Sequence, residues 1–92
     1  MTVSKAISIM GLSESDFQKK GDKHIHDLGD SDTFSHLFNL LDEDDRFEED
    51  LDAQDINLFS NTVVFIDDEG EIECTLTADF ENDEYTLVIE EV

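Results

Sequence analysis

Alternation of apolar and polar residues over positions 71–80 limits the possible folds of this chain more than any other feature. In EIECTLTADF, one set of alternate side chains is apolar and the other is acidic or threonine. Successive side chains of a β-strand point to opposite faces, so the pattern predicts a strand with one buried and one hydrated face. The buried set is Ile72, Cys74, Leu76, Ala78 and Phe80, and the hydrated set is Glu71, Glu73, Thr75, Thr77 and Asp79.

Two segments of similar character flank this strand. TVVFID at 62–67 and EYTLVIEEV at 84–92 are rich in β-branched and aromatic residues, which are typical of strands. The intervening DEG at 68–70 and END at 81–83 are turn sequences. These three strands predict an antiparallel meander over residues 61–92.

Helical signals come earlier in the chain. Ser4 and Gly11 bracket a short apolar pattern and predict a helix over 4–10. SESD at 13–16 is typical of a capping box and predicts a second helix over 13–20. The stretch 21–30 is expected to be a loop or a short extended segment.

A third helix is predicted over 32–42, because apolar residues recur there at helical spacing. They are Phe34, Leu37, Phe38 and Leu41. Phe47 and Leu51 continue four residues apart and predict a short helix over 44–52 that these two residues anchor, although its many like charges oppose helix formation.

Together these elements predict an α+β fold, with short N-terminal and central helices packed on a C-terminal three-stranded antiparallel meander. A chain of 92 residues is long enough for one small domain, 1–92. We divide it into a less acidic helical part (1–30), helices with an acidic run (31–58) and the sheet (61–92).

The chain is strongly and unevenly acidic. It has 26 Asp and Glu residues against five Lys and Arg, for a formal net charge of -21. Four of the five basic residues lie before residue 27, and all but three of the acidic residues follow. Such a surface repels nucleic acids and anionic membranes, and it attracts basic protein clefts. A single cysteine and the lack of a signal-like N-terminus favour a cytoplasmic protein, in the host cell if the gene is carried by a phage.

Calcium and zinc sites are poorly supported by spacing. An EF-hand loop beginning at Asp42 would place Phe47 at its glycine position and Ala53 at its bidentate glutamate position. His24 and His26 could share one face of an extended segment and bind zinc with Asp22 or Cys74, but surface histidines near acids are the better interpretation. Whether these two histidines bind a metal stays open.

The chain has no phosphate-binding glycine loop, nucleophile elbow or cysteine–histidine arrangement, so an enzyme is not expected, and no cofactor is implied. Same-face residues along a strand lie about 6.6 Å apart, so acidic residues there form files of negative charge comparable to phosphates along a nucleic-acid strand. The predicted partner-binding, phosphate-mimicking residues are Asp42, Glu43, Asp44, Asp45, Glu48, Glu49, Asp50, Asp52, Asp55, Asp67, Asp68, Glu69, Glu71, Glu73, Asp79, Glu84 and Glu90.

With these dense carboxylates on a short single domain, the chain resembles the DNA-mimic proteins of bacteriophages and bacteria, most closely the small anti-restriction nuclease proteins of T-even phages. The resemblance lies in size, charge and style, without a diagnostic motif. It implies a non-enzymatic inhibitor that occupies the basic DNA-binding groove of a restriction or other defence nuclease. It also implies a possible homodimer, for which edge strands of the meander and the less acidic N-terminal face are the expected contacts.

Two alternatives stay open. The chain could be an acidic interaction module that binds a basic protein outside any nucleic-acid site. It could also be a divalent-metal-binding protein. A merely hydrated acidic surface explains the composition less well, because a net charge of about 2 to 8 is enough for solubility.

Overall fold

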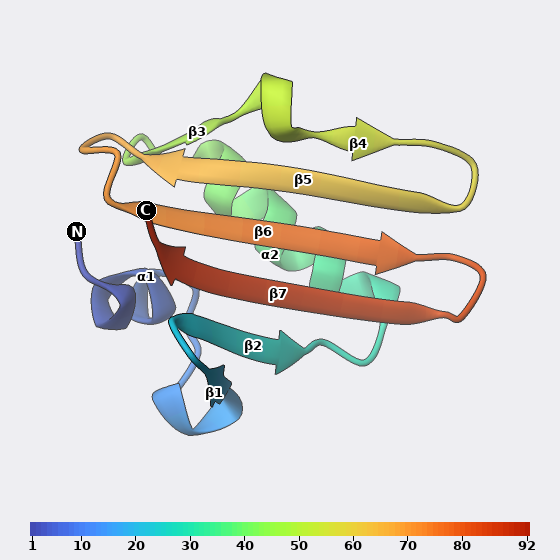
Figure 1. The fold of residues 1–92 in the computed structure, drawn as a ribbon, viewed down its shortest axis with the longest axis horizontal. Coiled ribbons are helices and arrows are strands. Elements are labelled where there is room, and N and C mark those ends of the chain that lie inside the picture. Colours follow the sequence, from blue (N-terminus) through green and yellow to red (C-terminus); the bar gives the residue numbers. More distant parts are fainter.

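Seven strands form one antiparallel β-sheet, and both helices lie on one of its faces (Figure 1). The computed structural model describes residues 1–92. The strand order is β1-β2-β7-β6-β5-β3, and the short β4 also pairs with β5. In chain order the elements are α1 (Val3–Ile9), β1 (Gln18–Lys20), β2 (Lys23–Asp27), α2 (Ser31–Glu43), β3 (Phe47–Glu49), β4 (Asp55–Ile56), β5 (Ser60–Asp67), β6 (Ile72–Asp79) and β7 (Glu84–Glu91), with 3-10 turns at Glu14–Asp16 and Leu51–Ala53.

The predicted meander is confirmed as β5, β6 and β7. The predicted alternation also holds in β6, where every second side chain from Ile72 is buried and the intervening ones are half-buried. Leu76 faces Leu87 and Cys74 faces Ile89 across β6 and β7, and all four are fully buried. Phe80 was predicted to point inward, but it follows the last residue of β6 and is about half exposed.

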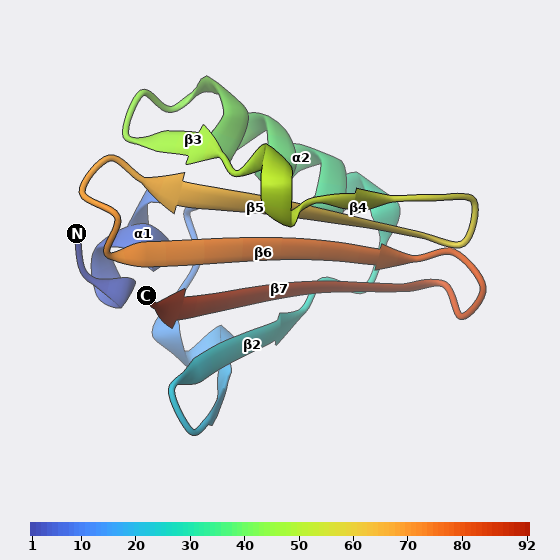
Figure 2. The same cartoon turned by 45° about the horizontal axis from the view of Figure 1, so that its top comes forward.

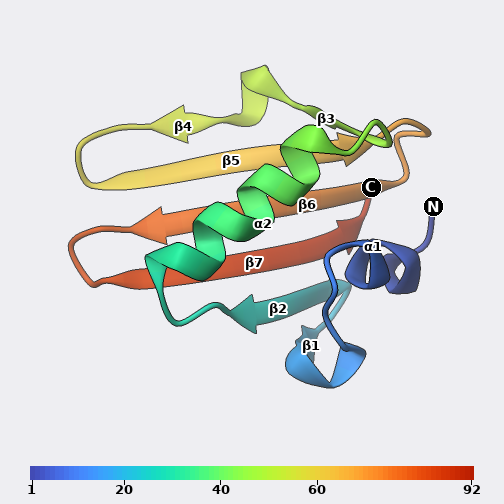
Figure 3. The same cartoon turned by 180° about the vertical axis from the view of Figure 1, so that it is seen from behind.

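Helix α2 crosses the sheet diagonally on what we call the inner face, and α1 packs on the same side near β7 (Figure 3). The Asp30 carboxylate caps α2 by accepting the Thr33 N–H at 2.7 Å. Leu37 and Leu41 are buried beneath α2, and the Phe38 ring meets the Phe65 ring edge-on at 5.6 Å. Neither helix combines the length and apolar character needed to span a bilayer.

The α+β class predicted from the sequence is confirmed, but the sheet is wider than the three-stranded meander. Residues 21–30, predicted as a loop or short extended segment, contain β2, which pairs with β7 along its whole length. On the other side, β3 and β4 pair with β5. The outer strands of the meander are therefore covered, so they do not offer the free edges predicted as a dimer contact. The free edges of the sheet are β1 and the β3–β4 segment.

The N-terminal prediction is partly wrong. The first helix is capped by Thr2 instead of Ser4, with the Thr2 hydroxyl accepting the Lys5 N–H at 3.1 Å. Residues 13–20 do not form a helix. The Asp16 carboxylate accepts the Ser13 N–H at 2.9 Å, but only a single 3-10 turn follows. Because Phe17 is the one apolar side chain available for burial in this segment, a helix here would lack an apolar face.

The helix predicted over 44–52 is also wrong. The chain leaves α2 at Asp44 and forms β3, then the 3-10 turn, then β4, which follow one another along β5 (Figure 2). Phe47 is buried as predicted, whereas Leu51 is exposed and does not anchor the segment. Extended structure separates neighbouring carboxylates more than a helix does, and β5 supplies a partner strand, so pairing overrides the helical spacing.

The burial of Cys74 gives a direct test of how rigid the central strand is. Its pKa is raised to about 12, first by burial and then by the charges of Asp67 and Glu73. We expect the native thiol to react with a disulfide reagent at pH 8 roughly a thousandfold more slowly than in urea, because the thiolate is the nucleophile. Rapid labelling of the native protein would show instead that β6 opens locally.

Candidate acidic interaction surface

Charge is polarised across the sheet. The acidic residues predicted at 42–55 lie on the C-terminal end of α2 and on the β3–β4 segment; we call this region the acidic edge. At the opposite edge, Lys19 and Lys20 lie on β1 and Lys23 begins β2. Most carboxylates of the acidic edge are exposed, and only one of them is paired with a cation.

The paired carboxylate is Asp44. Its two oxygens accept hydrogen bonds from Nε and a terminal nitrogen of Arg46 at 2.9 and 2.7 Å. These hydrogen bonds lower the pKa of Asp44 to about 2. Because this charge is already neutralised by its neighbour, Asp44 is the predicted acidic-edge residue least suited to bind a basic partner.

Carboxylates are crowded elsewhere in the acidic edge. The pKa of Glu49 is raised, chiefly because its carboxyl hydrogen-bonds to the Asp42 carboxylate, with burial adding to the effect. Two acids can share a hydrogen bond only if one of them holds a proton. The negative charge of the neighbouring carboxylate opposes the loss of that proton.

The outer face of the sheet, opposite the helices, carries a row of acids that runs across the strands. Glu73 on β6 is the direct partner of Glu90 on β7, and Ile66 separates Glu73 from Glu48 on β3. The acids end at Glu90, whose partner on β2 is Lys23. Adjacent strands lie about 4.8 Å apart, so these carboxylates are spaced by roughly 5 to 10 Å. The acidic edge and the predicted acids of the strand face thus meet in this row, which we call the outer row.

A second group of acids lies at the other end of the same face. Asp79 and Glu84 are direct partners on β6 and β7, six residues along the strands from the outer row, or about 20 Å. Threonine and valine side chains, including Thr75 and Val88, occupy the face between the two groups. Asp27 on β2 shares this face through its pairing with Thr86, and it was not among the predicted residues.

Asp67 does not belong to the exposed surface, contrary to its predicted role. It is only 4% exposed, and its Oδ1 accepts the backbone N–H groups of Glu71 and Ile72 at 2.7 and 2.9 Å. Burial acts to raise the pKa of Asp67, but these two donors and the N-terminal ammonium outweigh it, so the pKa is lowered. Its function is to hold the β5–β6 turn.

The acids beside Asp67 bind the N-terminal ammonium of Met1. The Met1 nitrogen lies 2.8 Å from a Glu71 oxygen, 3.3 Å from a Glu69 oxygen and 3.5 Å from Asp67 Oδ2. These three carboxylates are also the only group of three potential metal ligands within 4.8 Å of one another. Because the ammonium already neutralises part of their charge, the cluster is explained without a metal.

This contact predicts a loss of stability in alkali. The pKa of the Met1 ammonium is raised from 8.0 to about 10, mainly by its hydrogen bond to Glu71. A folded-state pKa above the unfolded one means that the stabilisation is complete below about pH 8 and disappears as the pH rises through 10. We expect thermal melts from pH 7 to 10.5 to show this step, and N-terminal acetylation to remove it.

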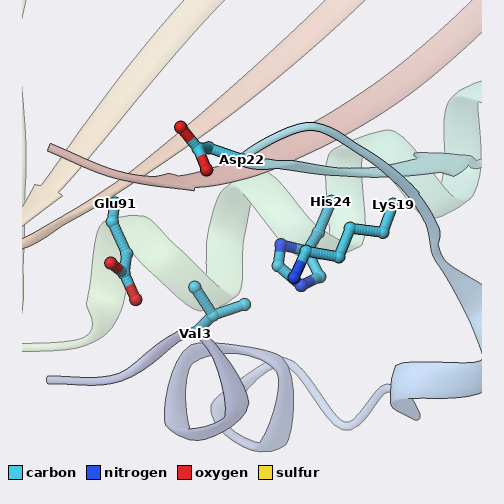
Figure 4. Close-up of a pocket in the computed structure, with 5 residues that line it drawn as sticks. All are labelled: Val3, Lys19, Asp22, His24 and Glu91. Carbon is cyan, nitrogen blue, oxygen red and sulfur yellow. The ribbon is translucent and has the colours of Figure 1, made fainter.

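The two histidines that could have formed a zinc site lie on β2 and face the helices. His26 packs against the Phe17 ring at 5.2 Å. His24 lies beside Lys19 in a pocket of about 120 Å³ that Asp22 and Glu91 also line (Figure 4). They are not among the groups of three metal-ligating side chains, and a neighbouring lysine disfavours a metal cation.

Comparisons with protein-family models, with curated proteins and with solved structures found no match to this chain.

Proposed function

We propose that this protein is a non-enzymatic DNA-mimic inhibitor that occupies the basic DNA-binding groove of another protein, of the restriction or defence nuclease class. The observation that carries the proposal is the outer row together with the acidic edge. Glu48, Glu73 and Glu90 lie on an open sheet face, spaced on the scale of backbone phosphates. No side-chain ion pair in the structure involves any of them.

Glu90 has Lys23 on β2 as its second direct partner, but no cation lies opposite Glu48 or Glu73. Unbalanced charge of this kind costs stability, which argues that it serves a partner. Glu73 and Glu90 face each other directly, and like charges in that position destabilise a sheet. Only Asp44, Asp67, Glu69 and Glu71 take part in ion pairs. A basic groove would supply the missing cations, and association would be fast and strongly dependent on salt.

The central experiment is displacement by DNA. The protein is immobilised, exposed to bacterial lysate at low salt, and eluted with duplex DNA, and the released proteins are identified. Mimicry predicts that a DNA-binding nuclease is released. If a bound basic protein resists elution by DNA but leaves in high salt, the acidic surface binds outside a nucleic-acid site and mimicry is wrong.

Charge reversal locates the binding surface. We expect Glu48→Lys combined with Glu73→Lys to weaken binding to the eluted nuclease by about tenfold or more, because two contacts to a basic groove become repulsive. Titration calorimetry at two salt concentrations measures both the affinity and its salt dependence.

The matched control is Asp22→Lys with Glu91→Lys, which changes the net charge equally but on the pocket of Figure 4, on the inner face. Equal loss of binding in both variants would mean that net charge alone, and not the outer row, governs recognition.

A further inference from the structure

Four exposed apolar residues lie in or next to the β4–β5 and β6–β7 connections, which are side by side at one end of the sheet (Figure 1). Leu58 is 90% exposed, Ile56 66%, Phe59 60% and Phe80 48%. The two connections are joined, because the Phe80 N–H donates to the Phe59 carbonyl at 2.9 Å. We call these four residues the apolar tip. Single exposed apolar residues are ordinary, whereas several in adjoining connections are typical of an interaction site.

The apolar tip is held in a fixed conformation. The Asn57 side-chain oxygen accepts the N–H groups of Phe59 and Ser60 at 2.8 and 3.0 Å. In the neighbouring connection, the Asp79 carboxylate accepts the N–H groups of Glu81 and Asn82 at 3.1 and 3.2 Å. Turns held by such side-chain hydrogen bonds form equally well with small polar residues at their other positions. Leucine and phenylalanine are therefore not required by the turns themselves. A turn whose backbone is already fixed loses little conformational entropy when a partner binds it.

The charges around the apolar tip indicate the occupant. Asp55 precedes Ile56, and Asp79 and Glu81 flank Phe80, with Asp83 in the same turn. A second copy of this chain would bring the same acids together and be repelled. A surface with an apolar pocket bordered by lysine and arginine would be complementary in both shape and charge.

We propose that the apolar tip is a docking anchor that inserts into an apolar pocket bordered by basic residues on the protein partner. It deepens the proposed function, since the partner that the acidic surface attracts would be held in register by the tip. Charge then steers the encounter, and the buried leucine and phenylalanine supply the slow dissociation that a small number of central residues provide at protein interfaces.

The test uses two labelled peptides of equal charge, one alternating lysine with leucine and one alternating lysine with serine, at about 0.15 M salt, where surface charges are partly screened. We expect the lysine–leucine peptide to bind the wild-type protein about tenfold more tightly, and Leu58→Ser with Phe59→Ser to abolish that preference. The control, Leu51→Ser with Val92→Ser, removes two exposed apolar side chains elsewhere and should keep the preference. Equal binding of both peptides, or a preference that survives in the tip variant, would overturn the proposal.

Amide chemical shifts of the wild-type protein provide a second measurement that does not depend on the variants folding. The lysine–leucine peptide should shift Leu58, Phe59 and Phe80, and the lysine–serine peptide should not. Sedimentation tests the other occupant: a wild-type dimer that Leu58→Ser with Phe59→Ser converts to a monomer would assign the tip to a second copy and overturn the proposal. Because neither measurement involves DNA, failure of the displacement experiment would leave this result intact, and the reverse also holds.

Discussion

Asp67→Ala is expected to lower the free energy of unfolding by about 2 to 5 kcal/mol, a large fraction of the stability of a small domain. The Asp67 carboxylate is the acceptor for two backbone N–H groups, those of Glu71 and the buried Ile72. Each buried donor left without a partner costs about 1 to 3 kcal/mol. The variant also takes one of three carboxylates away from the Met1 ammonium. Urea unfolding followed by circular dichroism measures the difference.

The sign of this effect separates local from global electrostatics. If overall repulsion at a net charge of -21 dominated, removing any carboxylate would stabilise the fold. Asp68→Ala is the matched control, because Asp68 is exposed and its side chain caps no backbone group. It should be neutral or slightly stabilising. Asp67→Asn keeps a side-chain oxygen as acceptor and should fall between wild type and alanine. A stabilised Asp67→Ala would contradict the structural role of this residue.

The sequence predicted the parts of this fold in which pattern and packing agree. In β6 and β7 the period-two alternation coincides with β-branched residues and with turns at both ends, and α2 has an apolar face together with a capping residue. The segments predicted wrongly have few apolar residues. Residues 13–20 and 44–52 each contain at most two large ones, so helical spacing could be assigned by chance, and pairing with a neighbouring strand decided the outcome.

The candidate surface was predictable as a composition but not as an arrangement. That Glu48 shares a row with Glu73 and Glu90 follows from the pairing of β3 with β5, which brings together residues far apart in the sequence. The burial of Asp67 could not be predicted for a similar reason. Its hydrogen-bond partners are backbone N–H groups of the turn, which any sequence supplies. The apolar tip carried one local signal, a leucine–phenylalanine pair between two asparagines, without the periodicity of a strand or helix.

Salt is expected to stabilise this protein strongly. Raising sodium chloride from about 10 mM to 0.3 M shortens the Debye length from about 30 Å to less than 8 Å, well below the 33 Å long axis of the molecule. Repulsion among unpaired carboxylates is then screened, and it is more severe in the folded state because the charges are closer together. We expect the melting temperature to rise by about 10 °C, which corresponds to roughly 2 kcal/mol for a domain of this size. Scanning calorimetry at a series of salt concentrations gives this curve.

The shape of the curve distinguishes screening from a general salt effect on apolar burial. Screening is nearly complete by about 0.3 M, so the melting temperature should level off there. Preferential exclusion of salt from the protein surface would instead raise the melting temperature steadily. Glu73→Gln removes the like-charge pair with Glu90 and leaves Glu90 opposite Lys23, so it should raise the melting temperature at low salt and reduce its further rise. A melting temperature independent of salt in the wild type would mean that the carboxylates are already compensated, so that their repulsion would no longer indicate a basic partner.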